Sequence, residues 1–352
     1  MSWIETSKNG TLRLCDRVKI DGKLKQFKVP LEKDTPQARR IAMERLQEKI
    51  SLNSTPMAEK PVYDVLEAYL ARDIRESTRI MQRAALQTML NAVGDVPLHR
   101  LTAPLIKRAL LETGKSPKTL NNTLQHVKSF LNWCFEYGYI QDDVARRLRK
   151  FPDNSKPKNP EDLYLEPDEL QYLLDNLSGM MYYCVKFLAL TGLRCGEMSA
   201  LTLDDISENY ISITKSFNHR SMQVTDPKNA SSIREVFIQP ELRDLLDEYL
   251  KWRLLYMMSQ GIRTDLLFFT RAGDRMRCSN LNCRMKCINK KYHVHLMRHT
   301  HTALLAEQGI SLDAIARRLG HVSDRTTRDV YFHVTKKQRQ KDEQAISRVR
   351  IL

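Results

Sequence analysis

The stretch from His295 to Tyr331 constrains the fold of this chain more than any other. Its apolar residues recur three or four positions apart, which is the spacing of helices that bury one face. Gly309 and Gly320 follow these runs at positions where glycine commonly ends a helix. The stretch therefore predicts two short packed helices whose ends present polar and cationic side chains to a common cleft.

Four side chains of this stretch stand out by their positions. His295 and Arg298 are three residues apart and share one helix face. His321 directly follows a helix-ending glycine, so a fixed turn presents its imidazole, and Tyr331 comes ten residues later. Upstream, a segment reading ALTGLRCGEMSALTLDDI begins at Ala189 and contributes a further arginine, Arg194.

In this order, the two segments resemble the active site of the tyrosine recombinases, the phage integrase family. The resemblance implies a mixed α+β catalytic domain and an enzyme that breaks and rejoins DNA strands. A tyrosine can hold one DNA end covalently while another strand is exchanged. Because this linkage keeps the bond energy and side chains stabilise the developing charge, we expect neither a cofactor nor a metal.

The resemblance also implies a role for each residue. Tyr331 is expected to attack the scissile phosphate and to keep the 3′ end as a phosphotyrosine. Arg194 and Arg298 would bind the nonbridging oxygens, because a guanidinium is a planar bidentate donor that stays charged. His321 would add a hydrogen bond to the phosphate, and His295 would assist removal of the tyrosine proton near neutral pH.

Neighbouring residues are expected to support this set. Glu197 lies three residues beyond Arg194 on the same helix face and would brace its guanidinium. His299 and His301 lie close to Arg298 on a crowded helix, so we interpret both as structural, with His299 retained as a supporting residue of the site.

The leaving 5′ oxygen needs a proton donor, which in this family is a lysine on a β-hairpin between the two arginine segments. We expect Lys228, in VTDPKNASSIREVFI, to be that donor. The family often reads Thr-Lys-Thr-x-x-Ser-x-Arg here, whereas this chain has Asp226-Pro227-Lys228-Asn229. Lys215 therefore remains the alternative.

The charge of the chain indicates its partner. It has 57 Lys and Arg against 42 Asp and Glu, a net charge of +15 with a sequence pI near 9.5. The basic residues are spread over the whole chain, which favours double-stranded DNA bound along an extended surface over a merely basic soluble protein. No apolar run approaches a membrane span and no N-terminal apolar segment indicates secretion, so we expect a cytoplasmic, nucleoid-associated protein of a bacterial cell.

Seven cysteines, an odd number without framework spacing, fit a reducing compartment. Cys278, Cys283 and Cys287 precede His293 and His295, but their spacing does not repeat the C-x-x-C pattern of a zinc knuckle. We therefore expect no metal site and interpret these cysteines as small buried helix residues.

Residues 1–33 alternate apolar and polar side chains, with hairpin turns at Asn9-Gly10 and Asp21-Gly22. The three expected strands are Trp3–Ile4, Thr11–Ile20 and Leu24–Val29. Thr35 and Pro36 then open a helix to about Ile50. This unit resembles the arm-binding domain of many integrases, whose sheet enters the major groove. The lysines expected to contact DNA are Lys19, Lys23, Lys25 and Lys28.

Two polar stretches that contain proline, Asn53–Pro56 and Phe151–Asp162, are interpreted as linkers. They divide the chain into expected domains at 1–55, 56–155 and 156–352. The middle domain has a period of 3.6 residues throughout, which predicts a helical fold. Its expected helices are Val62–Asp73, Ser77–Val93, Ala103–Glu112, Pro117–Tyr137 and Asp142–Lys150, with Ser77, Thr102 and Ser116 as N-caps.

The fourth of these helices resembles the groove-facing helix of the family's core-binding domain. Its core side is expected to include Leu120, Leu124, Val127, Phe130, Leu131 and Phe135. Asn121 lies on its polar side, and the residues expected to contact DNA are Thr119, Asn122, Gln125 and Lys128. A solvated helix face is the alternative.

In the last domain, helices are expected to begin at Glu166–Glu169 and to cover Met180–Thr191 and Pro240–Met258. Tyr210–Thr214 and Glu235–Ile238 resemble strands, and Leu266–Thr270 a short buried strand or turn. The predicted fold class is a multidomain, mainly α protein with a small N-terminal three-stranded sheet, a helical core-binding domain and a mixed α+β catalytic domain.

Together these features predict a site-specific recombinase of integrase type that uses core- and arm-type attachment sites. It would act as a tetramer on DNA, through a Holliday junction, with DNA-bending or directionality proteins, to integrate and excise a phage or conjugative element. An extra N-terminal domain favours such an integrase over the shorter chromosome-dimer resolvases. A type IB topoisomerase, which acts as a monomer, and a DNA-binding repressor with a degenerate site remain the alternatives.

Overall fold

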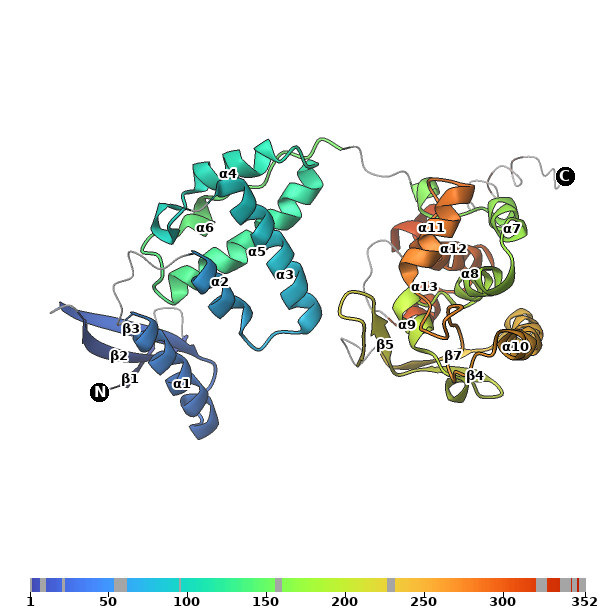
Figure 1. Ribbon diagram of the computed structural model, residues 1–352, viewed down its shortest axis with the longest axis horizontal. Coiled ribbons are helices and arrows are strands. Elements are labelled where there is room, and N and C mark those ends of the chain that lie inside the picture. The colour runs from blue at the N-terminus through green and yellow to red at the C-terminus, as the bar shows by residue number, and fades with distance from the viewer. Residues whose placement is uncertain are drawn as a thin grey trace. The chain divides into compact units, whose positions relative to one another are not determined.

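A computed structural model describes residues 2–6, 11–20, 23–53, 62–94, 96–155, 160–226, 232–320 and 328–335, together with Glu343 and Ser347 (Figure 1). The chain divides into two compact units, Met1–Ser155 and Lys156–Leu352. The division falls inside the stretch that the sequence suggests as a linker, Phe151–Asp162.

The first unit begins with an antiparallel sheet in the order β1 (Trp3–Thr6), β2 (Leu12–Ile20) and β3 (Lys23–Leu31). Helix α1 (Pro36–Asn53) covers one face of this sheet (Figure 1). Because side chains alternate between the two faces of a strand, alternate apolar residues of β2 and β3 face the helix. This small core consists of Leu14, Phe27, Val29, Leu31, Ala42 and Leu46. Thr35 caps the helix as expected, since its Oγ1 accepts the Ala38 N–H at 3.3 Å.

The rest of the first unit is helical and has its own core. Its helices are α2 (Val62–Leu70), α3 (Glu76–Val93), α4 (Ala103–Glu112), α5 (Pro117–Glu136) and α6 (Val144–Arg147), with a 3-10 turn at Leu98–Arg100. Amphipathic helices bury their apolar stripes together, and Tyr69, Phe130 and Trp133 form the centre of this core through edge-to-face contacts.

Three expectations for this unit are wrong. Helix α3 begins one residue early, with Arg75 rather than Ser77 at its N-cap. The helix expected at Asp142–Lys150 is a single turn, because Leu148 is extended and the chain then runs to Phe151. Phe135 is 43% exposed rather than part of the core, since it lies in the last turn of α5.

The second unit is a mixed domain that is mainly helical. Its helices are η3 (Pro160–Leu163), α7 (Pro167–Asp175), α8 (Gly179–Thr191), α9 (Cys195–Ala200), η4 (Leu203–Asp205), α10 (Pro240–Gln260), α11 (Cys278–Ile288), α12 (Val294–Glu307) and α13 (Leu312–Leu319). Two antiparallel pairs accompany them: β4 (Tyr210–Ile213) with β7 (Arg234–Phe237), and β5 (Ser216–Asn218) with β6 (Gln223–Thr225). The predicted fold class is confirmed.

Some details of the second unit differ from the expectations. The β5–β6 hairpin was not predicted, because its strands are short and polar. Leu266–Thr270, expected to be a short buried strand or turn, makes isolated bridges that pair Leu266 with Thr202 and Phe269 with Arg275. Cys283 and Cys287 are exposed on α11, not buried, because they face away from the core that Leu281 and Met285 join. Within the described ranges, no helix is long and apolar enough to cross a membrane.

Helix α8 lies at the centre of the second unit and ends at a tightly packed glycine. Gly192 is left-handed (φ +67°), and a Cβ there would lie 2.6 Å from His301 Cδ2 and from Leu319 Cδ2. Any larger residue would therefore force α12 and α13 away from the end of α8.

We predict that Gly192→Ala lowers the free energy of unfolding by more than Gly261→Ala does. Both glycines have positive φ, but a Cβ at Gly261 meets nothing within 4 Å. Gly261→Ala is therefore the control and should lower the free energy of unfolding only by the cost of a left-handed backbone at alanine, about 1–2 kcal/mol. Urea unfolding followed by circular dichroism measures both, and equal losses would show that the close packing around Gly192 is unimportant.

Candidate active site

Arg194 occupies the short link between α8 and α9, directly before the first turn of α9. Glu197, in that turn, accepts the Arg194 backbone N–H at 2.9 Å and Nη1–H at 2.8 Å. The Glu197 side chain is only 5% exposed, whereas that of Arg194 remains 41% exposed. The carboxylate therefore holds one edge of the guanidinium, and the side chain stays accessible to a ligand.

A second arginine meets the same carboxylate. Arg234 on β7 donates from Nη2 to Glu197 Oε2 at 2.9 Å and from Nη1 to Oε1 at 3.2 Å. Burial acts to raise the pKa of Glu197, but hydrogen bonding and charge from Arg234, with the charge of Arg194, outweigh it and leave the pKa below its ordinary value of 4.5. Arg234 was missed in the sequence, although it ends the Ser-x-Arg of the hairpin motif.

Arg298 on α12 joins two of the predicted segments. Its guanidinium is 1% exposed and donates from Nη1 to the Gly192 carbonyl and from Nη2 to the Leu319 carbonyl, both at 2.8 Å. Gly192 lies two residues before Arg194, and Leu319 lies two residues before His321. The arginine therefore fixes the end of α8 against the end of α13.

The histidines of α12 differ in their surroundings. His295 is exposed in the first turn, and its ring lies edge-on to that of buried His299, with centroids 4.6 Å apart. His301 is buried, with Nδ1 2.8 Å from the Ala189 carbonyl and Nε2 accepting from Arg318 Nε at 3.1 Å. Burial, with the nearby charge of Arg318, lowers the pKa of His301 to about 3. His301 is thus a neutral packing residue.

Tyr331 lies in a helical segment, residues 328–335, and is half-buried. It packs against an apolar cluster of Tyr164, Ala303, Ala306, Ile315, Leu319, Val330 and Val334. Since Leu319 belongs to this cluster and its carbonyl accepts from Arg298, the tyrosine segment is held against the same end of α13.

Lys228 and His321 lie outside the described residues. The alternative lysine, Lys215, is described: its Nζ lies 2.8 Å from Asp205 Oδ2 and donates to Thr202 Oγ1 at 3.2 Å. Lys215 therefore already has an acidic partner. In the part of the chain that the structure describes, no group of three His, Cys, Asp or Glu is placed to hold a metal.

The first unit carries the expected DNA-contact residues, and the structure adds others. Lys25 is exposed, Lys28 forms an ion pair with Glu5, and the side chains of Lys19 and Lys23 lie outside the described residues. The sheet face opposite α1 also presents Arg13 and Arg17, which the sequence reading missed. Because strand residues two apart share a face, these two arginines were predictable from the register.

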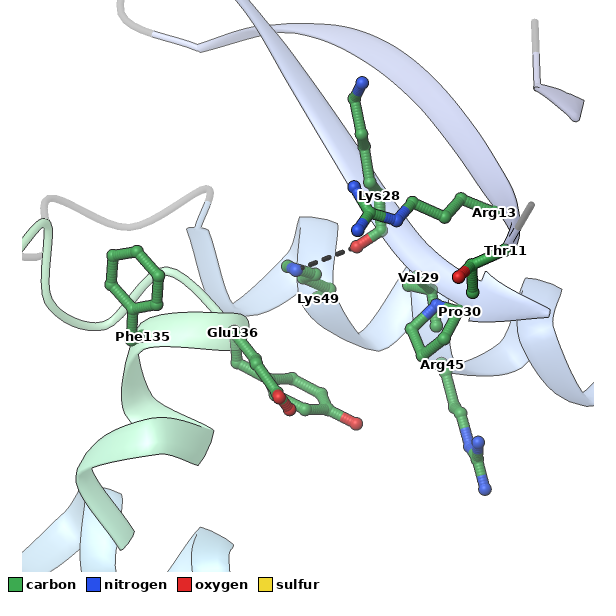
Figure 2. A pocket seen from close by; sticks show the side chains of 10 residues that line it. Thr11, Arg13, Lys28, Val29, Pro30, Arg45, Lys49, Phe135 and Glu136 are labelled. Carbon is green, nitrogen blue, oxygen red and sulfur yellow. Dashed lines mark hydrogen bonds between the residues drawn. The ribbon is translucent and has the colours of Figure 1, made fainter. Parts of the chain in front are cut away.

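A basic hollow lies beside this sheet face within the first unit. The cavity has a volume of about 570 Å³. The side chains that line it include Arg13, Lys28, Arg45, Lys49 and Glu136 (Figure 2). Lys49 reaches into it and donates to the Lys28 carbonyl at 2.9 Å. Burial lowers the pKa of Lys49 despite the nearby Glu136 charge. The side chains that line this cavity include four cations, Arg13, Lys28, Arg45 and Lys49, and one carboxylate, Glu136.

Helix α5 presents a polar face. Thr119, Asn122 and Gln125 are exposed and Lys128 is half-buried, as a groove-facing role would require. Asn121 has a different task, because its side chain donates to the Phe151 carbonyl at 3.0 Å and accepts the Phe151 N–H at 2.8 Å. It therefore anchors the chain that leaves the helical core.

Comparison with known proteins identifies the family. Residues 164–338 match the phage integrase family model. The prophage ps2 probable integrase of Lactococcus lactis is 28% identical, covering 95% of this chain and 96% of that protein. The ICEBs1 integrase of Bacillus subtilis is 31% identical over 65% of each chain. The chain belongs to the phage integrase family and is a tyrosine recombinase.

Solved structures agree on the fold. A Tn1549 transposon integrase in complex with transposon right end DNA superposes with a TM-score of 0.63 at 20% identity, covering 80% of this chain and 99% of that one. A lambda integrase dimer bound to a COC′ core site gives 0.57 at 17% identity, covering 93% and 94%. The fold is therefore shared with the lambda integrase over 93% of this chain and with the Tn1549 integrase over 80% of it.

We predict that Glu197→Gln lowers the free energy of unfolding at pH 7 by about 3 kcal/mol, because it removes the charged partner of two guanidiniums. The pKa of Glu197 is lowered in the folded protein, so its contribution is fully present above the ordinary value of 4.5 and is lost as pH falls through the folded value. The difference between variant and wild type should therefore shrink below about pH 4.5. Urea unfolding at several pH values measures it, and a difference that does not change with pH would contradict the charge argument.

Proposed function

We propose that the protein is a site-specific integrase that cleaves and rejoins DNA strands through a 3′-phosphotyrosyl intermediate and a Holliday junction, integrating and excising a mobile element. The observation that carries this proposal is the pair of hydrogen bonds from Arg298. They join the segment of Arg194 to the segment that precedes His321 and packs against Tyr331.

In this proposal Tyr331 attacks the scissile phosphate, and the phosphotyrosine bond replaces the broken phosphodiester bond. Arg194 and Arg298 stabilise the negative charge on the nonbridging oxygens, with His321 as a further donor. Lys228 gives a proton to the leaving 5′ oxygen, and His295 assists removal of the tyrosine proton. The reverse reaction with a 5′ hydroxyl of another strand rejoins the DNA without an external energy source.

The N-terminal sheet favours an integrase over the alternatives. Its face opposite α1 carries Arg13 and Arg17, and Lys28 beside them, as a phosphate-binding surface would require. The match to the prophage integrase spans 95% of this chain, so it includes this unit. A repressor would need none of the catalytic set, and a topoisomerase would need no second DNA-binding surface.

The partners follow from this assignment. We propose that residues 1–55 bind arm-type DNA, that residues 56–155 bind core-type DNA with the polar face of α5, and that residues 156–352 cleave. A lambda integrase tetramer bound to a Holliday junction has the same fold, with a TM-score of 0.57 at 17% identity. A tetramer of this chain on DNA, aided by DNA-bending or directionality proteins on the bacterial nucleoid, is the corresponding assembly.

We predict that Tyr331→Phe binds core-site DNA as the wild type does and forms no covalent adduct, because only the phenolic oxygen is lost. A nicked suicide substrate that spans a candidate junction traps the adduct for a denaturing gel. Tyr256→Phe is the control, since Tyr256 stacks on Trp252 and should cleave normally. An adduct that persists in Tyr331→Phe would mean that another residue is the nucleophile.

We predict that removing residues 1–55 spares cleavage of a short core site and impairs integration between full attachment sites. The deleted segment has twelve Lys and Arg against seven Asp and Glu, a net loss of five positive charges. Affinity for arm-containing DNA should therefore fall less steeply with salt than in the full chain. Gel shifts at several salt concentrations measure this. Loss of core-site cleavage by a folded truncation would reject the assignment of this unit.

A further inference from the structure

Arg234 holds a central place among the described residues of the site, although the proposed chemistry does not use it. Its side chain is 6% exposed. Besides the two bonds to Glu197, its Nε donates to the Arg318 carbonyl at 2.7 Å and its Nη1 to the Ser232 carbonyl at 3.1 Å. One guanidinium therefore ties β7 to α9 and to the last turn of α13.

Glu197 is shared between two arginines in a regular way. Its Oε1 accepts from Nη1 of Arg194 and Nη1 of Arg234, and its Oε2 accepts from the Arg194 backbone and from Nη2 of Arg234. A carboxylate on a flexible side chain can rotate, but a bidentate arginine fixes its plane. The orientation of Glu197, and through it that of the Arg194 guanidinium, thus depends on Arg234.

The other side of Arg234 packs on the glycine that ends α13. A Cβ at Gly320 would lie 2.8 Å from Arg234 Nη1 and 2.9 Å from its Cδ. Gly320 is left-handed (φ +71°), and the next residue in the chain is His321. The same side chain therefore supports the end of α13 that directly precedes His321 in the chain.

We propose that Arg234 is a positioning residue for strand cleavage, which orients Arg194 through Glu197 and fixes the turn before His321. This inference rests on the proposed function, in which Arg194 neutralises charge on the scissile phosphate. Arg234 acts without contact to DNA. Its loss should slow the chemical step and leave DNA binding unchanged.

A methylphosphonate at the scissile position provides the test. It replaces one charged nonbridging oxygen with a methyl group, so the substrate has less need of a well-placed Arg194. On ordinary phosphate, Arg234→Met should cleave nicked suicide DNA about 100-fold more slowly than wild type, the usual cost of one lost oxyanion donor. On methylphosphonate the ratio of the wild-type cleavage rate to that of Arg234→Met should be at least about tenfold smaller than on ordinary phosphate. Arg194→Ala should show the same narrowing.

Arg253→Met is the matched control. Arg253 is also an arginine with a buried side chain, and among the described residues its guanidinium donates to the Thr264 and Leu266 carbonyls rather than to a carboxylate. The Arg253→Met variant also loses a buried guanidinium, so any decrease in its cleavage rate should be equal on the phosphate and the methylphosphonate substrates. Circular dichroism and affinity for core-site DNA are measured for every variant.

Arg234→Lys keeps the test informative if Arg234→Met does not fold. A lysine keeps the charge and loses the bidentate geometry, so it should show a smaller defect on phosphate with the same narrowing on methylphosphonate. Wild-type cleavage of phosphate by a folded Arg234 variant, or an equal defect on both substrates, would overturn the inference alone. Wild-type protein that forms no adduct on either substrate would overturn the proposed function and this inference with it.

Discussion

The catalytic unit depends on the hydrogen bonds that the buried guanidinium of Arg298 donates to two backbone carbonyls. A charge that is 1% exposed is costly unless hydrogen bonds satisfy it, and the Gly192 and Leu319 carbonyls are two of its acceptors. Both carbonyls lie at the ends of helices, where backbone oxygens lack partners within the helix. The same bonds that satisfy the arginine therefore bring together the ends of α8 and α13, two residues before Arg194 and His321.

The second constraint is the carboxylate of Glu197 between two guanidiniums. A buried carboxylate with one cation would leave acceptor capacity unused, but here each oxygen accepts from both arginines. The pKa of Glu197 is accordingly lowered despite its burial. The Arg194 side chain stays 41% exposed, although its guanidinium is held by the buried Glu197 carboxylate. A positive charge with a fixed orientation is therefore accessible at the surface. Such a group can meet a phosphate without reorganisation.

The N-terminal sheet and helix, residues 1–55, show how much of a fold local sequence patterns can predict. Alternation and turn residues predicted three strands and a helix, and the observed strands differ only at their ends. The four lysines proposed for DNA contact were less informative, because Lys25 and Lys28 are three apart and fall on opposite faces of a strand. Arg13 and Arg17 share a face with Lys28 through the β2–β3 register. Strand register, not residue type, decides which cations form one surface.

The sequence by itself determined the approximate extent of α8 and α10, the glycine that ends α13 and the order of Arg194, Glu197, Arg298 and Tyr331, because spacing and glycine chemistry are local. It could not show that Arg298 bonds Gly192 and Leu319 or that Arg234 shares Glu197. It also misjudged Cys283 and Cys287, which are exposed. Only the tertiary structure decided these points, since partners up to 106 residues apart are chosen by which carbonyls and carboxylates the packed helices leave unsatisfied.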